Sequence, residues 1–298
     1  MYSTNFYHVF IKSLILLLYC FLSLKMKKIL FILLTLSSFT YSQDATPIIS
    51  KKGSFYFYWG WNRGLYSKSD IHFQGLNYDF TLHDVAAQDK VAKGFRTYVD
   101  PATITIPQYN FRIGYFINDK YDISIASDHM KYVMKSYQTV KMDGYINNSG
   151  FPEYDGSYDN TSFDINPKFL QFEHTDGLNY LNVELRRNDS LFSKDFFKLR
   201  LIEGIGAGIL YPRSNTTLMG NARYDQFNVA GFGIGGVVAL NLEFWNRFFL
   251  QTELKAGFID MPSIRTTLYK ADKASQHFWF LQSNVVLGMN FNYKKKAK

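Results

Sequence analysis

The chain has 298 residues, of which 47 % are hydrophobic and 18 % aromatic, and its formal net charge at pH 7 is +8. Eight of its 33 lysines and arginines lie in the first 42 residues or the last five, where there is no acidic residue, so 25 basic residues elsewhere balance 25 acidic ones. This balance gives no support to a nucleic-acid-binding domain, which would need a basic face, and the single cysteine, Cys20, excludes disulfide bonds and thiolate zinc sites in the rest of the chain.

The first 42 residues have the order of a secretory signal peptide. Met26-Lys27-Lys28 is followed by an apolar run and then by small or polar residues up to Ser42. We expect cleavage near Ser42–Gln43, which leaves one domain, residues 43–298. An earlier apolar run covers residues 9–24. Either translation starts at Met26 and this run is not part of the protein, or the run belongs to a membrane anchor. Lysines keep both apolar runs shorter than the roughly 20 residues that a helix needs to cross a bilayer. The sequence therefore predicts export.

Beyond residue 53, apolar and polar residues alternate along segments that are long enough for tilted strands to cross a bilayer. Aromatic residues recur at the ends of these segments, as in the girdles of membrane barrels. A closed barrel leaves no unpaired backbone in lipid, so we predict an all-β fold, an antiparallel transmembrane β-barrel, with a secreted sandwich as the alternative. We expect ten strands, or twelve if the polar connections 84–102 and 134–165 hold two more. The ten are 53–66, 69–83, 103–117, 121–133, 166–174, 179–188, 196–211, 227–244, 248–261 and 275–293.

Two short turns, at residues 118–120 and 245–247, set the register of the strands beside them. Each turn pairs apolar with apolar and polar with polar residues, whereas a shift by one residue would mix them. The predicted pairs are Ile113 with Ile125, Asn110 with Asp128, Leu242 with Leu250, and Asn241 with Gln251.

A third turn is predicted at Asp176-Gly177, because Asp-Gly is the strongest two-residue signal for a hairpin. This turn pairs Phe172 with Leu181 on the apolar face. It places His174 at the rim of the barrel, facing lipid, and Glu173 in the lumen.

Two glycine-rich stretches, residues 204–208 and 231–236, resemble nucleotide-binding loops at first sight. Both lie inside alternating strands rather than between a strand and a helix. We therefore expect them to serve close packing or curvature of the barrel wall.

With these features the chain resembles the small Gram-negative outer-membrane β-barrel proteins of eight to twelve strands. The resemblance covers about residues 53–293 and rests on the strand pattern. It implies localisation in the outer membrane of a Gram-negative bacterium, contact with outer-membrane lipids and insertion by the barrel-assembly machinery. Such barrels usually end on an aromatic residue, whereas here Phe291 and Tyr293 are followed by KKKAK.

The inward-facing positions of the predicted strands mix acids and bases, without a ring of one sign. We expect a network that plugs a narrow lumen, because buried charges must be paired; a narrow channel for a small solute is the other possibility. The inward residues are Asn110, Arg112, Asp128, Gln171, Glu173, Asn182, Glu184, Arg186, Lys198, Arg200, Asn241, Gln251, Glu253, Lys255, Gln282 and Asn284.

A different class of function is a hydrolase or acyltransferase that acts on lipid A or phospholipid. The candidate catalytic residues are His174, Asp176 and His129. His174-Thr175-Asp176 weakly resembles the His-x-Ser core of lipid A deacylases, but Asp176 stands where the resemblance requires a hydroxyl nucleophile. His129 follows Asp128, which alternation sends to the opposite face. We therefore predict a non-enzymatic barrel without cofactor or metal ion, and keep the lipid enzyme as the alternative.

Overall fold

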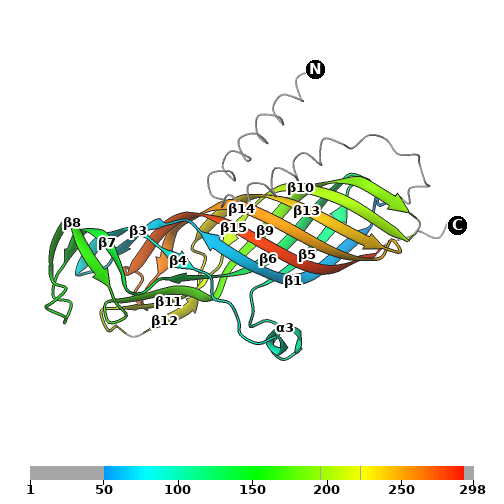
Figure 1. Ribbon diagram of the computed structural model, residues 1–298. Helices are drawn as coiled ribbons and strands as arrows, with labels where there is room; N and C mark the ends of the chain where they lie inside the picture. The colour runs from blue at the N-terminus through cyan, green and yellow to red at the C-terminus, as the bar shows by residue number, and fades with distance from the viewer. Residues whose placement is uncertain (1–49, 195, 222, 292–298) are drawn as a thin grey trace, which may run out of the picture. The chain divides into compact units, whose positions relative to one another are not determined.

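The computed structural model describes residues 50–291 apart from residues 195 and 222, so the predicted signal peptide, its cleavage point and the lysine-rich tail lie outside the described part. Within it, eight strands close into an antiparallel ring (Figure 1). The ring is closed by pairing between its first and last strands, with Phe55 opposite Phe291. The antiparallel barrel is therefore confirmed, with eight ring strands instead of ten. In ring order they are β1 (Phe55–Tyr66), β5 (Tyr109–Phe116), β6 (Tyr121–Met134), β9 (Leu170–Lys194), β10 (Phe197–Leu210), β13 (Gly231–Phe244), β14 (Phe248–Arg265) and β15 (Lys273–Phe291).

The remaining strands lengthen the wall at one end of the ring, and we call this part the extension. One branch of the extension pairs with β15, and another, β11 with β12, pairs with the start of β9. The connection 134–165 does hold two strands, β7 and β8, and the predicted strand 69–83 is split into β2 and β3 by residues 75–77. The strands outside the ring are β2 (Ser69–Gln74), β3 (Tyr78–Val85), β4 (Ala87–Gln88), β7 (Gln138–Ile146), β8 (Gly156–Ile165), β11 (Arg213–Leu218) and β12 (Tyr224–Phe227), and a short helix, α3 (Arg96–Val99), lies between β4 and β5. No helix among residues 50–291 is long and apolar enough to cross a membrane.

The registers predicted from the two short turns are confirmed. Ile113 pairs with Ile125 and Asn110 with Asp128 between β5 and β6. Between β13 and β14, Leu242 pairs with Leu250 and Asn241 with Gln251. These turns lie at the end of the ring where β1 begins and β15 ends, opposite the extension (Figure 1).

The predicted hairpin at Asp176-Gly177 is wrong, because β9 continues through it as one strand of 25 residues. Against β6, Leu178 pairs with Met130 and His174 with Tyr132, so β9 carries extra residues at this point. Gly177 has a φ of 125°, which absorbs the bulge. Both arms of the expected hairpin have other partners, β6 on one side and β10 or β11 on the other.

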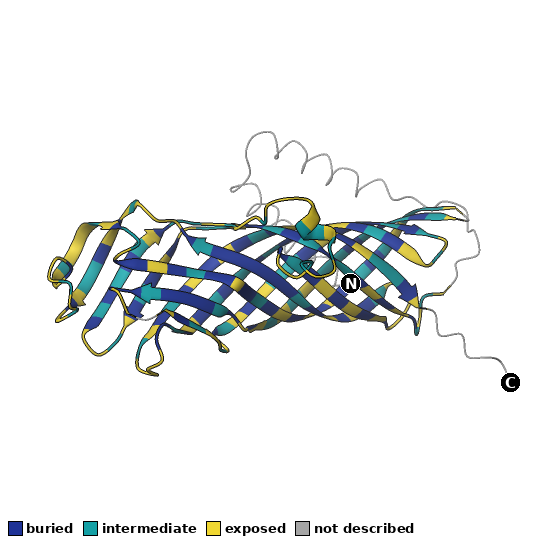
Figure 2. Cartoon of the chain, turned by 90° about the horizontal axis from the view of Figure 1, so that it is seen from below, coloured by how far each residue is buried: buried dark blue, intermediate teal, exposed yellow. Residues whose placement is uncertain are grey.

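Along the strands that run from the ring into the extension (β6, β9, β14 and β15), the polarity of the two faces reverses once. On β15, Gln282 and Asn284 point into the ring and are buried, while Val285 and Leu287 point outward and are half exposed. From Phe280 toward the extension, the buried side chains are mainly apolar and the outward ones polar. Figure 2 shows buried and exposed residues alternating along these strands.

The reversal falls at one level of the wall, which we call the switch level. An apolar exterior with a polar interior is the pattern of a transmembrane barrel, whereas the opposite pattern is that of a protein in water. The half of the ring beside the short turns is therefore the membrane-spanning part, and the extension stands in water around an apolar core. Moving toward the extension, the inward residues change from Asp128 to Met130, from Asn182 to Tyr180, from Lys255 to Ile259, and from Gln282 to Phe280.

Aromatic rings gather on the outside of the wall near the switch level. The Tyr109 ring lies between Trp59, with centroids 4.5 Å apart, and His129, at 4.7 Å. On another part of the wall, Phe258 packs on Trp279 with centroids 5.2 Å apart. Aromatic girdles mark the boundary between membrane and water, so this row marks one edge of the bilayer.

Candidate functional site

The polar interior of the ring is the candidate site. Of the inward residues predicted from the sequence, all but Gln171 and Glu173 are buried. These two lie on the water-facing side of β9, where the inward positions are Leu170 and Phe172. Their predicted place in the lumen is wrong because β9 is already beyond the switch level there, and Glu173 instead pairs with Lys90 at 3.3 Å.

Glu184 is the centre of the network. Its Oε1 lies 2.8 Å from a terminal nitrogen of Arg112 and 2.7 Å from Nζ of Lys255, and its Oε2 lies 2.8 Å from Nε of Arg186. All four side chains are at most 2 % exposed. Three cations from three strands therefore converge on one buried carboxylate.

Two further carboxylates balance the charge of this cluster. Arg186 also pairs with Glu253 at 2.8 Å, and Lys255 pairs with Asp128. Three cations thus meet three carboxylates, and the cluster is neutral. Such a balance is what burial requires, because an unpaired ion in a dry interior is strongly destabilising.

Neutral side chains occupy the remaining bonding positions around the charges. The Nε of Arg112 donates to the Tyr58 hydroxyl at 2.8 Å, and Asn182 donates to Asp128 at 3.0 Å. Asn284 donates to Glu253 at 2.8 Å. Tyr58 is a member that the sequence analysis missed, although it shares the inward parity of β1 with Tyr56 and Asn62.

Glycines on β10 make room for the network. Gly204, Gly206 and Gly208 occupy successive inward positions, beside the β9 residues that carry the charges. A Cβ at Gly206 would lie 2.4 Å from Cγ of Glu184, and one at Gly204 would lie 2.8 Å from Cγ of Arg186. The glycine-rich stretch therefore serves close packing, as expected, and lets the long side chains of β9 cross the lumen.

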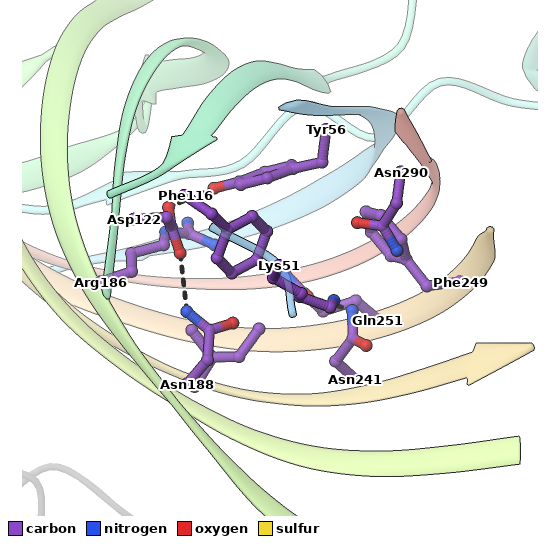
Figure 3. Close-up of a pocket in the computed structure, with 11 residues that line it drawn as sticks. Lys51, Tyr56, Phe116, Asp122, Arg186, Asn188, Asn241, Phe249, Gln251 and Asn290 are labelled. Atoms are coloured by element: carbon purple, nitrogen blue, oxygen red, sulfur yellow. Dashed lines mark hydrogen bonds between the residues drawn. The ribbon is translucent and has the colours of Figure 1, made fainter. Parts of the chain in front are cut away.

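A small cavity lies on the short-turn side of the cluster (Figure 3). It is lined by Lys51, Tyr56, Asp122 and Asn188 among others, and Asn188 donates to Asp122 at 2.7 Å across it. Its volume is about 20 Å³, which is room for roughly one water molecule. Side chains therefore fill the ring at this level, as expected for a barrel of eight strands.

The candidate catalytic residues do not come together. His174 is fully buried inside the extension, against the rings of Phe172 and Tyr132 at 5.0 and 5.6 Å, so its predicted place on the lipid-facing rim is wrong. Asp176 is on the outer surface of the extension, 3.8 Å from Arg223. His129 points outward at the switch level, 2.8 Å from Oδ1 of Asn179, while Asp128 points inward as expected.

A serine that the sequence did not point to lies beside His174. Nδ1 of His174 is 2.8 Å from Oγ of Ser214, which is also fully buried. The serine is on β11, a strand that the alternation did not predict. Burial lowers the pKa of His174 to about 3, so its ring is neutral at ordinary pH. A buried pair among aromatic rings has no access for a lipid substrate and acts as a polar contact within the core.

On the outer face of the extension, His83 links two strands through carboxylates. Its Nδ1 lies 3.0 Å from Asp70 and its Nε2 lies 2.8 Å from Asp143. The hydrogen bond with Asp70, followed by the one with Asp143, raises the pKa of His83. Within residues 50–291, no group of three histidine, cysteine, aspartate or glutamate residues is placed to hold a metal ion.

No protein-family model and no curated protein matches this chain. Among solved structures it is similar to the outer membrane protein OprG from Pseudomonas aeruginosa, with 9 % identity over 81 % of this chain and 97 % of that one, at a TM-score of 0.36. AlkL, solved in DMPC bilayers, gives 10 % identity over 87 % and 100 % of the two chains at a TM-score of 0.37. Ail of Yersinia pestis gives 10 % over 80 % and 99 % at 0.27. Because these scores lie below 0.5, it is the chain's own closed ring and apolar exterior that identify a transmembrane β-barrel of the outer-membrane type.

Proposed function

We propose that this protein is a non-conducting, non-enzymatic anchor in the outer membrane, which holds its extension outside the cell. The observation that carries the proposal is the neutral cluster around Glu184, which fills the ring where it crosses the membrane. Short turns face the periplasm in barrels of this type, so the extension would face the exterior. Outer-membrane lipids surround the ring, and the barrel-assembly machinery would insert it.

The arrangement favours a plug over a channel for a small solute. A solute would have to separate ion pairs such as Arg186–Glu253, at 2.8 Å. Breaking a buried pair costs about 3–5 kcal/mol, and several pairs lie on the same path. The alternative of a lipid hydrolase has less support, because His174 and Ser214 are buried inside the extension whereas Asp176 is exposed on its outer face.

Conductance across a planar lipid bilayer tests this function. We expect the purified protein to insert without single-channel steps. The matched variant removes one cation and one carboxylate together, R112A/E184A, so that the cluster loses two large side chains at unchanged net charge. Small conductance steps from this variant would show that the protein inserts into the bilayer under the conditions of the assay. The absence of steps from the unaltered protein would then reflect a closed lumen. Regular conductance steps from the unaltered protein would contradict the proposal and indicate a channel for a small solute.

A further inference from the structure

The segment between β4 and β5 stands out from the side of the wall, where the ring meets the extension (Figures 1 and 2). We call residues 90–106, which include α3, the lateral lip. Both ends of the lip are bound to β1. The carboxylate of Asp89 accepts a hydrogen bond from the Gly64 amide at 3.2 Å, and the Gln108 carbonyl accepts one from the Asn62 amide at 3.3 Å.

The middle of the lip is held at the same level. The Tyr98 ring meets the Trp61 ring edge-on, with centroids 6.3 Å apart, and its hydroxyl accepts a hydrogen bond from Arg63 at 2.6 Å. Trp61 pairs with Tyr109, which belongs to the aromatic row at the switch level. All three attachments therefore place the lip at the edge of the bilayer.

Apolar side chains of the lip point away from the protein. Phe95 is 80 % exposed, and Val91, Val99 and Ile106 are about half exposed. Exposed apolar residues scattered singly are ordinary, but here four belong to one short projection beside the membrane-spanning wall. Lys93 and Arg96 lie in the same segment, and basic residues beside apolar ones are typical of segments that lie in a membrane interface.

We propose that the lateral lip is a lipid-binding element, with Phe95 and Val99 inserted at the headgroup boundary of the outer leaflet. The lip adjoins the apolar exterior of the ring, because its Tyr98 contacts Trp61, which pairs with Tyr109, and that exterior belongs to the membrane-spanning half of the wall. Segments of this kind sit about 5–10 Å into the boundary between headgroups and acyl chains. The lip thereby fixes the depth of the barrel on the β1–β5 side.

Depth-dependent fluorescence quenching tests this placement. The chain has one cysteine, so a C20S background carrying F95C takes a single environment-sensitive dye. I125C labels a side chain on the membrane-spanning wall that is 68 % exposed, and L76C labels the β2–β3 turn, 88 % exposed at the far end of the extension. Each labelled full chain is reconstituted into phosphatidylcholine vesicles with nitroxide lipids, either shallow or deep.

We expect shallow nitroxides to quench the dye at F95C best, deep nitroxides to quench it best at I125C, and neither to quench it at L76C. Water-soluble iodide should quench the dye most at L76C, less at F95C and least at I125C. A label at V99C repeats the measurement from the other end of α3. If the dyes at F95C and V99C respond to iodide as L76C does and to neither lipid quencher, the lip lies in water and the proposal is wrong. Quenching by neither lipid nor iodide would indicate a protein partner, such as a second copy, and would also overturn it.

Discussion

The ammonium group of Lys255 lies 4.8 Å from the centre of the Tyr180 ring. Lys255 belongs to the charged cluster, through Glu184 and Asp128, whereas Tyr180 belongs to the apolar core of the extension. This contact is where the two interiors of the protein meet. A cation over an aromatic face is favourable, so the Tyr180 ring stabilises the Lys255 ammonium group at the border between the charged cluster and the apolar core.

Removing the charge of Lys255 should destabilise the barrel strongly. In K255M, Asp128 and Glu184 each lose a cationic partner in a dry interior, and we expect a loss of about 3–5 kcal/mol in the free energy of unfolding. Urea unfolding in detergent or vesicles, followed by tryptophan fluorescence, measures it. The control K120M lies in an exposed turn and should stay within about 0.5 kcal/mol of the parent.

The double variant K255M/D128N distinguishes charge from packing. It removes one charge of each sign, so it should regain part of the stability that K255M loses. If K255M unfolds like the parent, the pair contributes little and the ionic plug is not what stabilises the ring.

The inward glycines of β10 predict that substitutions at two neighbouring positions of this strand differ sharply in their effect on stability. In G206A the new methyl group meets Cγ of Glu184 and the Val183 carbonyl oxygen at 2.4 and 2.5 Å, and we expect about 1–3 kcal/mol of destabilisation from overpacking. The matched change A207V adds volume on the exposed, outward side of the same strand and should be tolerated. The folded fraction of each variant is measured by electrophoresis without heating. Equal folding of both variants would contradict the role of glycine in making room for the network.

Acid should loosen the extension through His174. Its pKa is about 3 when folded, against 6.5 as the ordinary value, so the unfolded chain binds more protons between these values. The stabilising contribution is therefore complete above pH 6.5 and falls by about 1.4 kcal/mol per pH unit as the pH drops toward 3. Hydrogen exchange of residues 170–174 and 213–218 at matched pH measures the opening. In H174N, which can still bond to Ser214, this dependence should disappear; an unchanged pH profile would show that other groups govern it.

Expression of the protein should leave lipid A and phospholipids unmodified. The histidine that the sequence offered for lipid chemistry is fully buried, and its neighbour Ser214 is equally inaccessible. Mass spectrometry of outer-membrane lipids, with and without expression, checks this. A new lipid species that is lost in S214A would restore the enzyme hypothesis.

Alternation was sufficient to predict most of the ring. The pairs Ile113–Ile125 and Leu242–Leu250 follow from a short turn and a period of two, because a shift by one residue would exchange the faces of both strands. The same reasoning found the buried partners Arg112, Glu184 and Glu253.

The errors arise where information from distant strands is needed. Asp176-Gly177 has the local signal of a turn, but pairing of both flanks with longer strands turns it into a bulge. The alternation of a strand separates its two faces but does not show which face meets water. For this reason it predicts the wrong face for Gln171 and Glu173. That choice depends on the switch level, which no single strand reveals. Ser214 is 40 residues from His174 in the sequence, and only the tertiary fold brings them together.

Strand β9 belongs both to the membrane-spanning wall and to the extension. Its 25 residues, at about 3.3 Å each and a tilt of roughly 40°, rise about 60 Å, twice the hydrocarbon thickness of about 30 Å. About half of the length of β9 therefore lies outside the bilayer and continues directly into the wall inside it. A molecule captured at its tip would be held at a stand-off of roughly 30 Å from the lipid, and a pull on that tip would pass along β9 directly to Arg186 and Glu184.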